Sequence, residues 1–154
     1  MNARIQKDVV ELAALKHRHS WEKSSNVSEQ TKSAQWVCHS WQQAVADNFR
    51  DRFRAEYPVG DGFNEKFDLV DLQDAVAYEL KVTENDTHFE FYRDIFKVAV
   101  HNAHNPRWQI KKLVFIIPTE GATQLDTRYA QAVRALAGQQ HSIAVQICGI
   151  KNGH

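Results

Sequence analysis

The sequence predicts an α/β protein in which a mixed β-sheet is flanked by helices, with two helices before the first strand. Three observations support this fold class. Apolar residues recur at helical spacing through the first 57 residues, short apolar runs typical of strands begin near residue 67, and helical and strand patterns alternate from residue 87 onward. This order favours a sheet that carries helices on both faces.

The two expected N-terminal helices span residues 3–18 and 29–56, and residues 20–28 form a polar loop between them. Within each helix, apolar side chains recur every three or four residues and form one continuous face. We expect the second helix to end before Tyr57-Pro58, because the residue that precedes a proline disfavours helical backbone.

A β-hairpin is expected where the apolar runs 67–71 and 77–82 flank a short polar turn. A loop of either two or four residues places Asp68 directly opposite Glu79. Because side chains alternate along a strand, Glu79 and Lys81 share one face. The hairpin therefore brings two carboxylates and an ammonium group together.

The remaining scaffold alternates between helix and strand. The expected elements are a helix over 87–104, a strand over 112–118, a helix over 123–137 that Gly138 ends, and a strand over 142–150. Thr87 and Glu90 have the spacing of a capping box at the start of the first of these helices.

Length and composition indicate one domain over residues 1–154, with a helical part over 1–57 and an α/β core over 63–150. The chain has no apolar run long enough to span a membrane and no signal-peptide pattern at its start, so we expect a cytoplasmic protein that does not enter a membrane. Two scattered cysteines are too few for a disulfide framework or a zinc ribbon.

Charge is unevenly distributed although the formal net charge is zero. Residues 61–90 hold nine acids and two bases, whereas residues 91–154 hold eight bases and three acids. An acidic centre flanked by basic segments suits a metal site that acts on a polyanion, since contacts to phosphate supply most of the non-specific affinity for nucleic acid.

The pairing of Asp68 with Glu79 is unfavourable on its own, because like charges directly opposite each other on paired strands repel. A bound cation turns this repulsion into chelation, and oxygen ligands that leave room for water and phosphate suit Mg²⁺. The alternative is that Glu79 and Lys81 are ordinary charges on the wet face of an edge strand.

A strand with a single acid, a short turn, a second strand with Glu-x-Lys and a following helix together resemble the PD-(D/E)XK nuclease superfamily, which has the restriction-endonuclease-like fold. The resemblance covers residues 63–118. Two departures stand out. Phe67 replaces the proline that often precedes the first acid, and only residues 58–63 are available for the strand that usually comes before it.

The resemblance implies a role for each matching position. Asp68 and Glu79 would ligate Mg²⁺, for which Mn²⁺ can substitute, together with the backbone carbonyl of Leu80. Lys81 would position the attacking water or help to deprotonate it. The metal would lower the pKa of that water and offset the charge that develops on the phosphate.

Further acids are candidates for the same site. The superfamily often has a glutamate on the helix before the hairpin, which would be Glu56 or Glu29 here. Asp71 would face Glu79 if the hairpin loop had three residues. Glu90 could be a further acid of the metal site, although its position in the capping box explains it about as well. Candidate nucleic-acid contacts are Tyr92, Arg93 and Lys97 on the following helix, and Arg54 in a basic stretch near residue 56.

Three functional hypotheses follow. The leading one is a Mg²⁺-dependent endonuclease acting on DNA in restriction, defence, repair or mobile-element biology. The second is a catalytically inactive module of the same fold that binds nucleic acid or a protein partner. The third is an unrelated α/β protein. The small size of the chain leaves no separate target-recognition domain, which favours a homodimer or a partner subunit.

Overall fold

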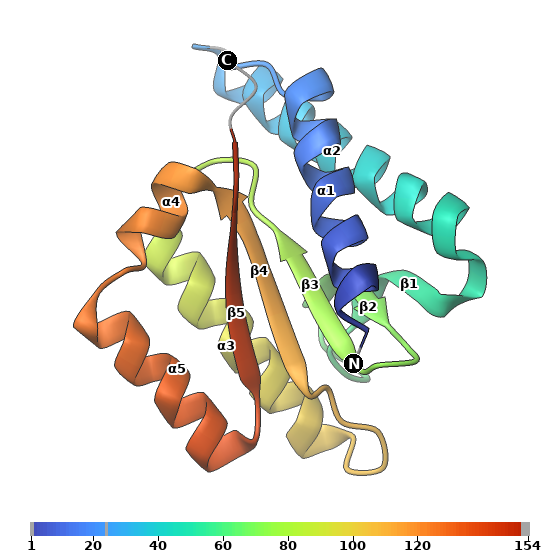
Figure 1. Ribbon diagram of the computed structural model, residues 1–154, viewed down its shortest axis with the longest axis vertical. Coiled ribbons are helices and arrows are strands. Elements are labelled where there is room, and N and C mark those ends of the chain that lie inside the picture. Colours follow the sequence, from blue (N-terminus) through green and yellow to red (C-terminus); the bar gives the residue numbers. More distant parts are fainter. Residues whose placement is uncertain (1, 24, 152–154) are drawn as a thin grey trace.

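A mixed sheet of five strands forms the centre of the protein in the computed structural model, which describes residues 2–23 and 25–151 (Figure 1). The strands are β1 (Phe53–Pro58), β2 (Lys66–Asp71), β3 (Val76–Leu80), β4 (Lys112–Pro118) and β5 (Ala144–Ile150). They lie side by side in chain order. Strand β2 runs antiparallel to both β1 and β3, whereas β3, β4 and β5 run parallel to one another.

Helices cover both faces of this sheet (Figure 1). They are α1 (Ala3–Ser20), α2 (Val27–Phe49), the short 3-10 helix η1 (Arg50–Arg52), α3 (Thr87–His104), α4 (Thr119–Gln124) and α5 (Arg128–His141). One face packs against α1 and α2, and the other packs against α3 and α5. The α/β class, the mixed sheet and the two N-terminal helices are thus as the sequence predicts.

The second helix ends earlier than we expect from the sequence. It stops at Phe49, and residues 53–58 form the edge strand β1 in place of the last helical turns. The spacing of four between Phe49 and Phe53 fits a helix equally well, but β1 supplies the antiparallel partner that the backbone of β2 needs. Residues 53–58, and not 58–63, therefore provide the strand before the acid strand.

The C-terminal third also departs from the expected boundaries. Two helices, α4 and α5, replace the single helix expected over 123–137. Thr127 caps α5 by accepting a hydrogen bond from the backbone N–H of Ala130. Gly138 lies inside α5, which ends at His141 and is followed by Ser142 in the left-handed conformation.

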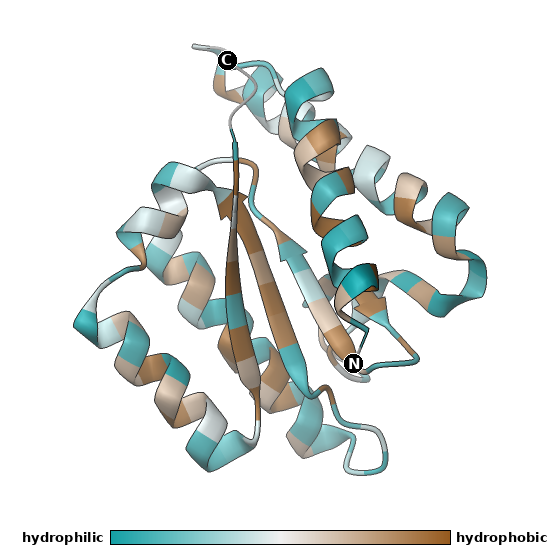
Figure 2. Ribbon diagram, viewed as in Figure 1, coloured by the Kyte–Doolittle hydropathy of each residue, from teal (hydrophilic) through white to brown (hydrophobic). Residues whose placement is uncertain are grey.

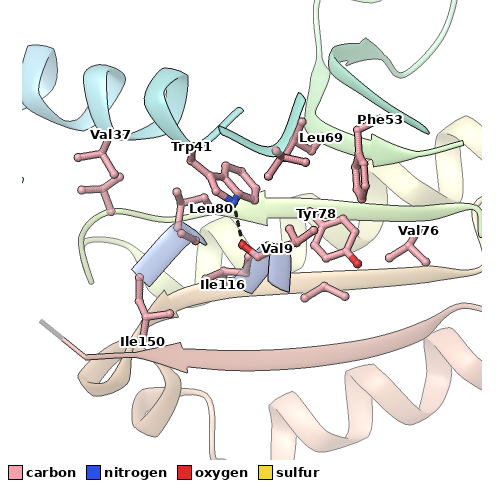
Figure 3. Packing of buried hydrophobic residues seen from close by; sticks show 14 of the residues in the cluster. Val9, Val37, Trp41, Phe53, Leu69, Val76, Tyr78, Leu80, Ile116 and Ile150 are labelled. Carbon is pink, nitrogen blue, oxygen red and sulfur yellow. Dashed lines mark hydrogen bonds between the residues drawn. The ribbon is translucent and has the colours of Figure 1, made fainter. Parts of the chain in front are cut away.

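The core consists of two layers of apolar side chains, one on each face of the sheet. Strand β4 contributes to both layers and is apolar along almost its whole length (Figure 2). In the layer under the N-terminal helices, Trp41 is fully buried and its indole N–H donates to the backbone carbonyl of Val9 at 3.0 Å (Figure 3). This hydrogen bond joins α2 to α1 above the sheet.

We predict that Trp41→Phe lowers the free energy of unfolding by roughly 2 kcal/mol, because it removes a buried hydrogen bond and leaves a gap in the layer. Urea unfolding followed by circular dichroism measures the change. The matched control is Trp36→Phe on the same helix, where the side chain is 63% exposed and the expected change is below about 0.5 kcal/mol. Equal changes in the two variants would contradict this view of the core.

Candidate functional site

The hairpin that carries the predicted site has the register that the sequence predicts. Strands β2 and β3 pair Leu69 with Tyr78 and Asp71 with Val76 across a four-residue loop. Continued by one residue, this register sets Asp68 opposite Glu79. Regular backbone pairing of β2 with β3 ends at Leu69 and Tyr78. Beyond it, the backbone N–H of Leu80 donates to Oδ2 of Asp68 at 2.9 Å. The Asp68 side chain thus takes the place of a backbone partner.

Glu79 is buried between the sheet and α3, and its side chain is 2% exposed. Its Oε1 lies 2.5 Å from Nζ of Lys97, which comes from the third turn of α3. Lys97 also donates to the backbone carbonyl of Lys66 at 2.8 Å. This lysine therefore fastens α3 to both strands of the hairpin.

Lys81, which follows β3, is held by two acids of α3. Its Nζ lies 2.9 Å from Oδ2 of Asp94 and 3.1 Å from Oε2 of Glu90, while Oε2 of Glu79 is 4.0 Å away. The other oxygen of Asp94 is 3.2 Å from Nζ of Lys97. Asp94 is completely buried and bridges the two lysines. We call these five residues, Glu79, Lys81, Glu90, Asp94 and Lys97, the acid–lysine network.

Burial and charge together set the protonation of this network. Burial raises the pKa of Glu79 well above its ordinary value, and the negative charges of Asp68 and Asp94 add to this effect. The two lysines oppose it. Burial alone would lower the pKa of Lys81, but the charges of Glu79 and Asp94 outweigh it and raise that pKa above its ordinary value. The ammonium group therefore stays charged at neutral pH.

On the opposite side of the hairpin, α2 contributes a buried glutamine. Nε2 of Gln42 donates to the backbone carbonyl of Asp68 at 2.8 Å and to Oε1 of Glu56 at 3.1 Å. Glu56 lies on β1 with a positive φ of 51° and not at the end of a helix. Cys38 lies on the same helix, α2. Burial raises the pKa of its thiol, and the nearby negative charges of Asp68 and Glu56 raise it further. Glu56 is thus close to the site from this side.

Of two further candidate acids, Asp71 does not take the position opposite Glu79 that a three-residue loop would give it, whereas Glu29 lies at the start of its helix as expected. Asp71 lies three residues from Asp68, about 10 Å along the strand, where it binds Arg52 and the turn N–H groups of Gln73 and Asp74. It stabilises the turn and is not a reserve ligand. Glu29 lies in the first turn of α2.

The capping box predicted at the start of α3 is absent. Asp86 occupies the N-cap position without a side-chain hydrogen bond, and the Thr87 hydroxyl donates to the backbone carbonyl of Glu84. Glu90 is free of a capping role and instead binds Lys81 and Arg93. Asp86, the residue before the helix, has left-handed backbone.

The candidate nucleic-acid contacts are distributed differently. Arg93 lies at the edge of the network with its side chain 46% exposed, whereas Lys97 is buried within it and is not accessible to a phosphate chain. Tyr92 packs against Phe91 and the ring of Tyr129. Arg54 projects from the edge strand β1, with its guanidinium 5.4 Å from the Tyr57 ring centroid.

Asp94 is the main site residue that sequence reasoning misses. The signal was its spacing, because Glu90, Asp94 and Lys97 follow one another at four and three residues and so share one side of a helix. They share that side with the apolar Phe91 and Val98 that pack on the sheet. Charges within a buried stripe indicate partners across the interface.

A cleft of about 740 Å³ opens beside Lys81 between α2, the loop after β3 and the start of α3. Cys38 and Gln35 line it from α2, and Asn85, Glu90 and Arg93 line it from the other side. Lys81 is therefore reachable from solvent although its side chain is only 15% exposed.

The donors at the end of the hairpin suit Mg²⁺ in type. Asp68 and Glu79 supply carboxylates, and Leu80, whose backbone N–H donates to Asp68, is the neighbouring residue that could add its carbonyl. Among residues 2–23 and 25–151, no group of three or more acidic, histidine or cysteine side chains is poised to hold a metal. Mg²⁺ commonly binds through one or two carboxylates plus water and substrate phosphate, so two acids and a carbonyl are sufficient.

Comparison of the chain with protein-family models, curated proteins and solved structures gives no match. None of the helices in the described part of the chain is long and apolar enough to cross a membrane.

We predict that Asp94→Asn lowers the free energy of unfolding by about 3–5 kcal/mol, because it leaves two buried ammonium groups with one carboxylate fewer. Chemical unfolding measures the loss. The control is Glu11→Gln, which removes an exposed pair with Lys7 at 3.9 Å on α1 and should change stability by less than about 0.5 kcal/mol. A small effect at Asp94 would show that the network does not hold α3 in place.

Proposed function

We propose that this protein is a Mg²⁺-dependent endonuclease that hydrolyses phosphodiester bonds, with DNA as the preferred substrate, and that its core is restriction-endonuclease-like. The observation that carries the proposal is the convergence of Asp68, Glu79 and Lys81 at the open end of one hairpin. A buried glutamate beside a second acid and a lysine is costly to maintain and is more typical of a functional site than of a solvated strand.

The strand order supports the same proposal. The antiparallel meander of β1, β2 and β3 is followed by a helix and a parallel strand, β4, with the acids on the second and third strands of the meander. The superfamily that the sequence resembles usually has a strand before the acid strand. Residues 53–58 fill that position, which removes one of the two departures.

The roles of the residues follow from their contacts. Asp68 and Glu79 would hold the metal with the carbonyl of Leu80, and the bound metal would supply the lowered pKa of water and charge neutralisation at the phosphate. Lys81 would position the attacking water from the cleft side. Asp94 and Glu90 are positioning residues, because they fix the Lys81 ammonium from two directions.

One observation favours the alternative of an inactive module that binds nucleic acid or a protein partner. Lys97 already neutralises Glu79, so the site is balanced by its own ion pairs. To use Oε1 of Glu79 as a ligand, a metal would have to displace Lys97, whereas Oε2 lies 4.0 Å from Lys81 and is less constrained. We propose a cytoplasmic location for either function, whereas the partner is nucleic acid for the nuclease and nucleic acid or a protein for the inactive module.

We predict that the wild-type protein converts supercoiled plasmid to nicked or linear DNA only when Mg²⁺ or Mn²⁺ is present. Lys81→Ala and Glu79→Gln should each reduce the rate at least about 100-fold, since the first removes the ammonium group that would position the attacking water and the second removes a carboxylate that would hold the metal. Gel assays on plasmid, single-stranded DNA and RNA measure the rates and rank the substrates.

The matched control is Glu65→Ala, an exposed acid in the loop before β2, which should cleave as the wild type does. Circular dichroism checks that each variant is folded. Undiminished cleavage by folded Lys81→Ala and Glu79→Gln variants would refute the proposed site. Binding of nucleic acid without turnover at any metal concentration would favour the inactive module.

A further inference from the structure

The solvent side of α3 carries an apolar stripe. Phe89, Phe96 and Val100 follow one another at seven and four residues, which places them along one side of the helix. They are 65%, 67% and 38% exposed. We call Phe89, Arg93, Phe96 and Val100 the α3 stripe. Exposed aromatic residues aligned in this way are typical of a contact surface, whereas single exposed apolar residues are ordinary.

Arg93 is the only charged residue of the stripe, and its charge is already compensated. Its guanidinium lies 5.9 Å from the ring centroid of Phe89, and it forms an ion pair with Glu90. The aliphatic part of the side chain therefore continues the apolar surface. The stripe can be covered without leaving an unpaired charge.

Helix α5 extends this surface on the same side of the sheet (Figure 1). Tyr129 is 70% exposed and its ring meets the ring of Tyr92 from α3 edge to face at 5.7 Å. Leu136, seven residues later on α5, is 55% exposed. The sequence of α5 contains no acidic residue.

The chemistry of this surface argues against a polyanion or a lipid surface as its occupant. Both need several accessible cations, whereas the stripe offers one arginine that is bound to Glu90. Helix α5 adds the exposed Arg128, while its Arg134 donates to the backbone carbonyl of Val145. A protein surface that is itself apolar and nearly uncharged is the complementary partner.

The stripe is complementary to itself when two copies run antiparallel. With residues 94 and 95 at the two-fold axis, Phe89 meets Val100 of the other copy, and Arg93 meets the other Phe96. The first pair sets a large side chain against a small one, and the second is a cation–π contact. The chain has zero net charge, so no long-range repulsion opposes this association.

We propose that the α3 stripe, extended by Tyr129 and Leu136 of α5, is the interface of a two-fold homodimer. Phe89, Phe96 and Tyr129 expose roughly 400 Å² between them in one copy. Two copies bury about twice that, and the flanking side chains bring the total toward the ~1,200 Å² at which specific interfaces begin. Because Glu90 and Asp94 lie on the side of α3 next to the stripe, the same helix would hold both candidate sites in one assembly.

Sedimentation velocity over a wide concentration range tests the interface, and it does not depend on nuclease activity. Wild-type protein should reach twice the 17.7 kDa of one chain as concentration rises. Phe96→Lys should remain monomeric, because it sets an ammonium group against the guanidinium of Arg93 in the other copy, and Phe89→Glu should remain monomeric because it buries a carboxylate against Val100. Trp36→Glu, at an equally exposed aromatic of α2, should dimerise as the wild type does.

Wild-type protein that stays monomeric at every concentration would overturn the proposal, as would Phe96→Lys that still dimerises. Loss of nucleic-acid binding in a Phe89→Glu variant of a monomeric wild type would assign the surface to nucleic acid instead. Each substituted side chain is about two-thirds exposed, so the thermal midpoint should change little. Glu79→Gln should dimerise normally, which separates this proposal from the proposed cleavage.

Discussion

The buried ion pairs between β3 and α3 are the interaction on which the rest of the structure depends. Burying lysine and carboxylate groups costs several kcal/mol for each ion unless every charge finds a partner. Here Asp94 meets both Lys81 and Lys97, and Lys97 meets Glu79. The network is satisfied only at one rotation and one height of α3. It therefore fixes which side of that helix faces the hairpin and which side faces solvent.

The two faces of the hairpin have separate tasks. The α3 side carries the acid–lysine network, and the α2 side holds the backbone through Gln42, which bonds to both Asp68 and Glu56. Asp68 and Glu79 thus lie between charged side chains on the α3 side and the neutral side chain of Gln42 on the α2 side. The packing on both faces keeps the carboxylates of Asp68 and Glu79 close together although they repel each other. Two carboxylates held in this way are suited to binding a cation.

The sequence could predict the register of the hairpin because loop length and side-chain alternation suffice to place Asp68 opposite Glu79. It could not predict β1. Apolar spacing of four residues continues from Phe49 to Phe53, and only pairing with β2 makes residues 53–58 a strand. The chain leaves α2 through a positive φ at Arg50, and an arginine gives no indication of such a conformation in the sequence, as a glycine would.

Asp94 escaped sequence reasoning for a related reason. Its partner Lys81 lies on another element, and an acid at four residues from Glu90 is ordinary on an exposed helix. The role of Glu90 depended on how α3 begins, and Thr87-x-x-Glu90 matches a capping box that does not form. Charge pairs across elements become visible only when the packing of the helix on the sheet is known.

The most direct test of the central claim is anomalous diffraction from crystals grown with Mn²⁺. We predict one strong peak at the end of the hairpin, with oxygens of Asp68 and Glu79 about 2.1 Å away, as expected for a hard cation of this size. A map without such a peak, in which Lys97 remains the sole partner of Oε1 of Glu79 and no ion lies near Asp68, would contradict the metal site.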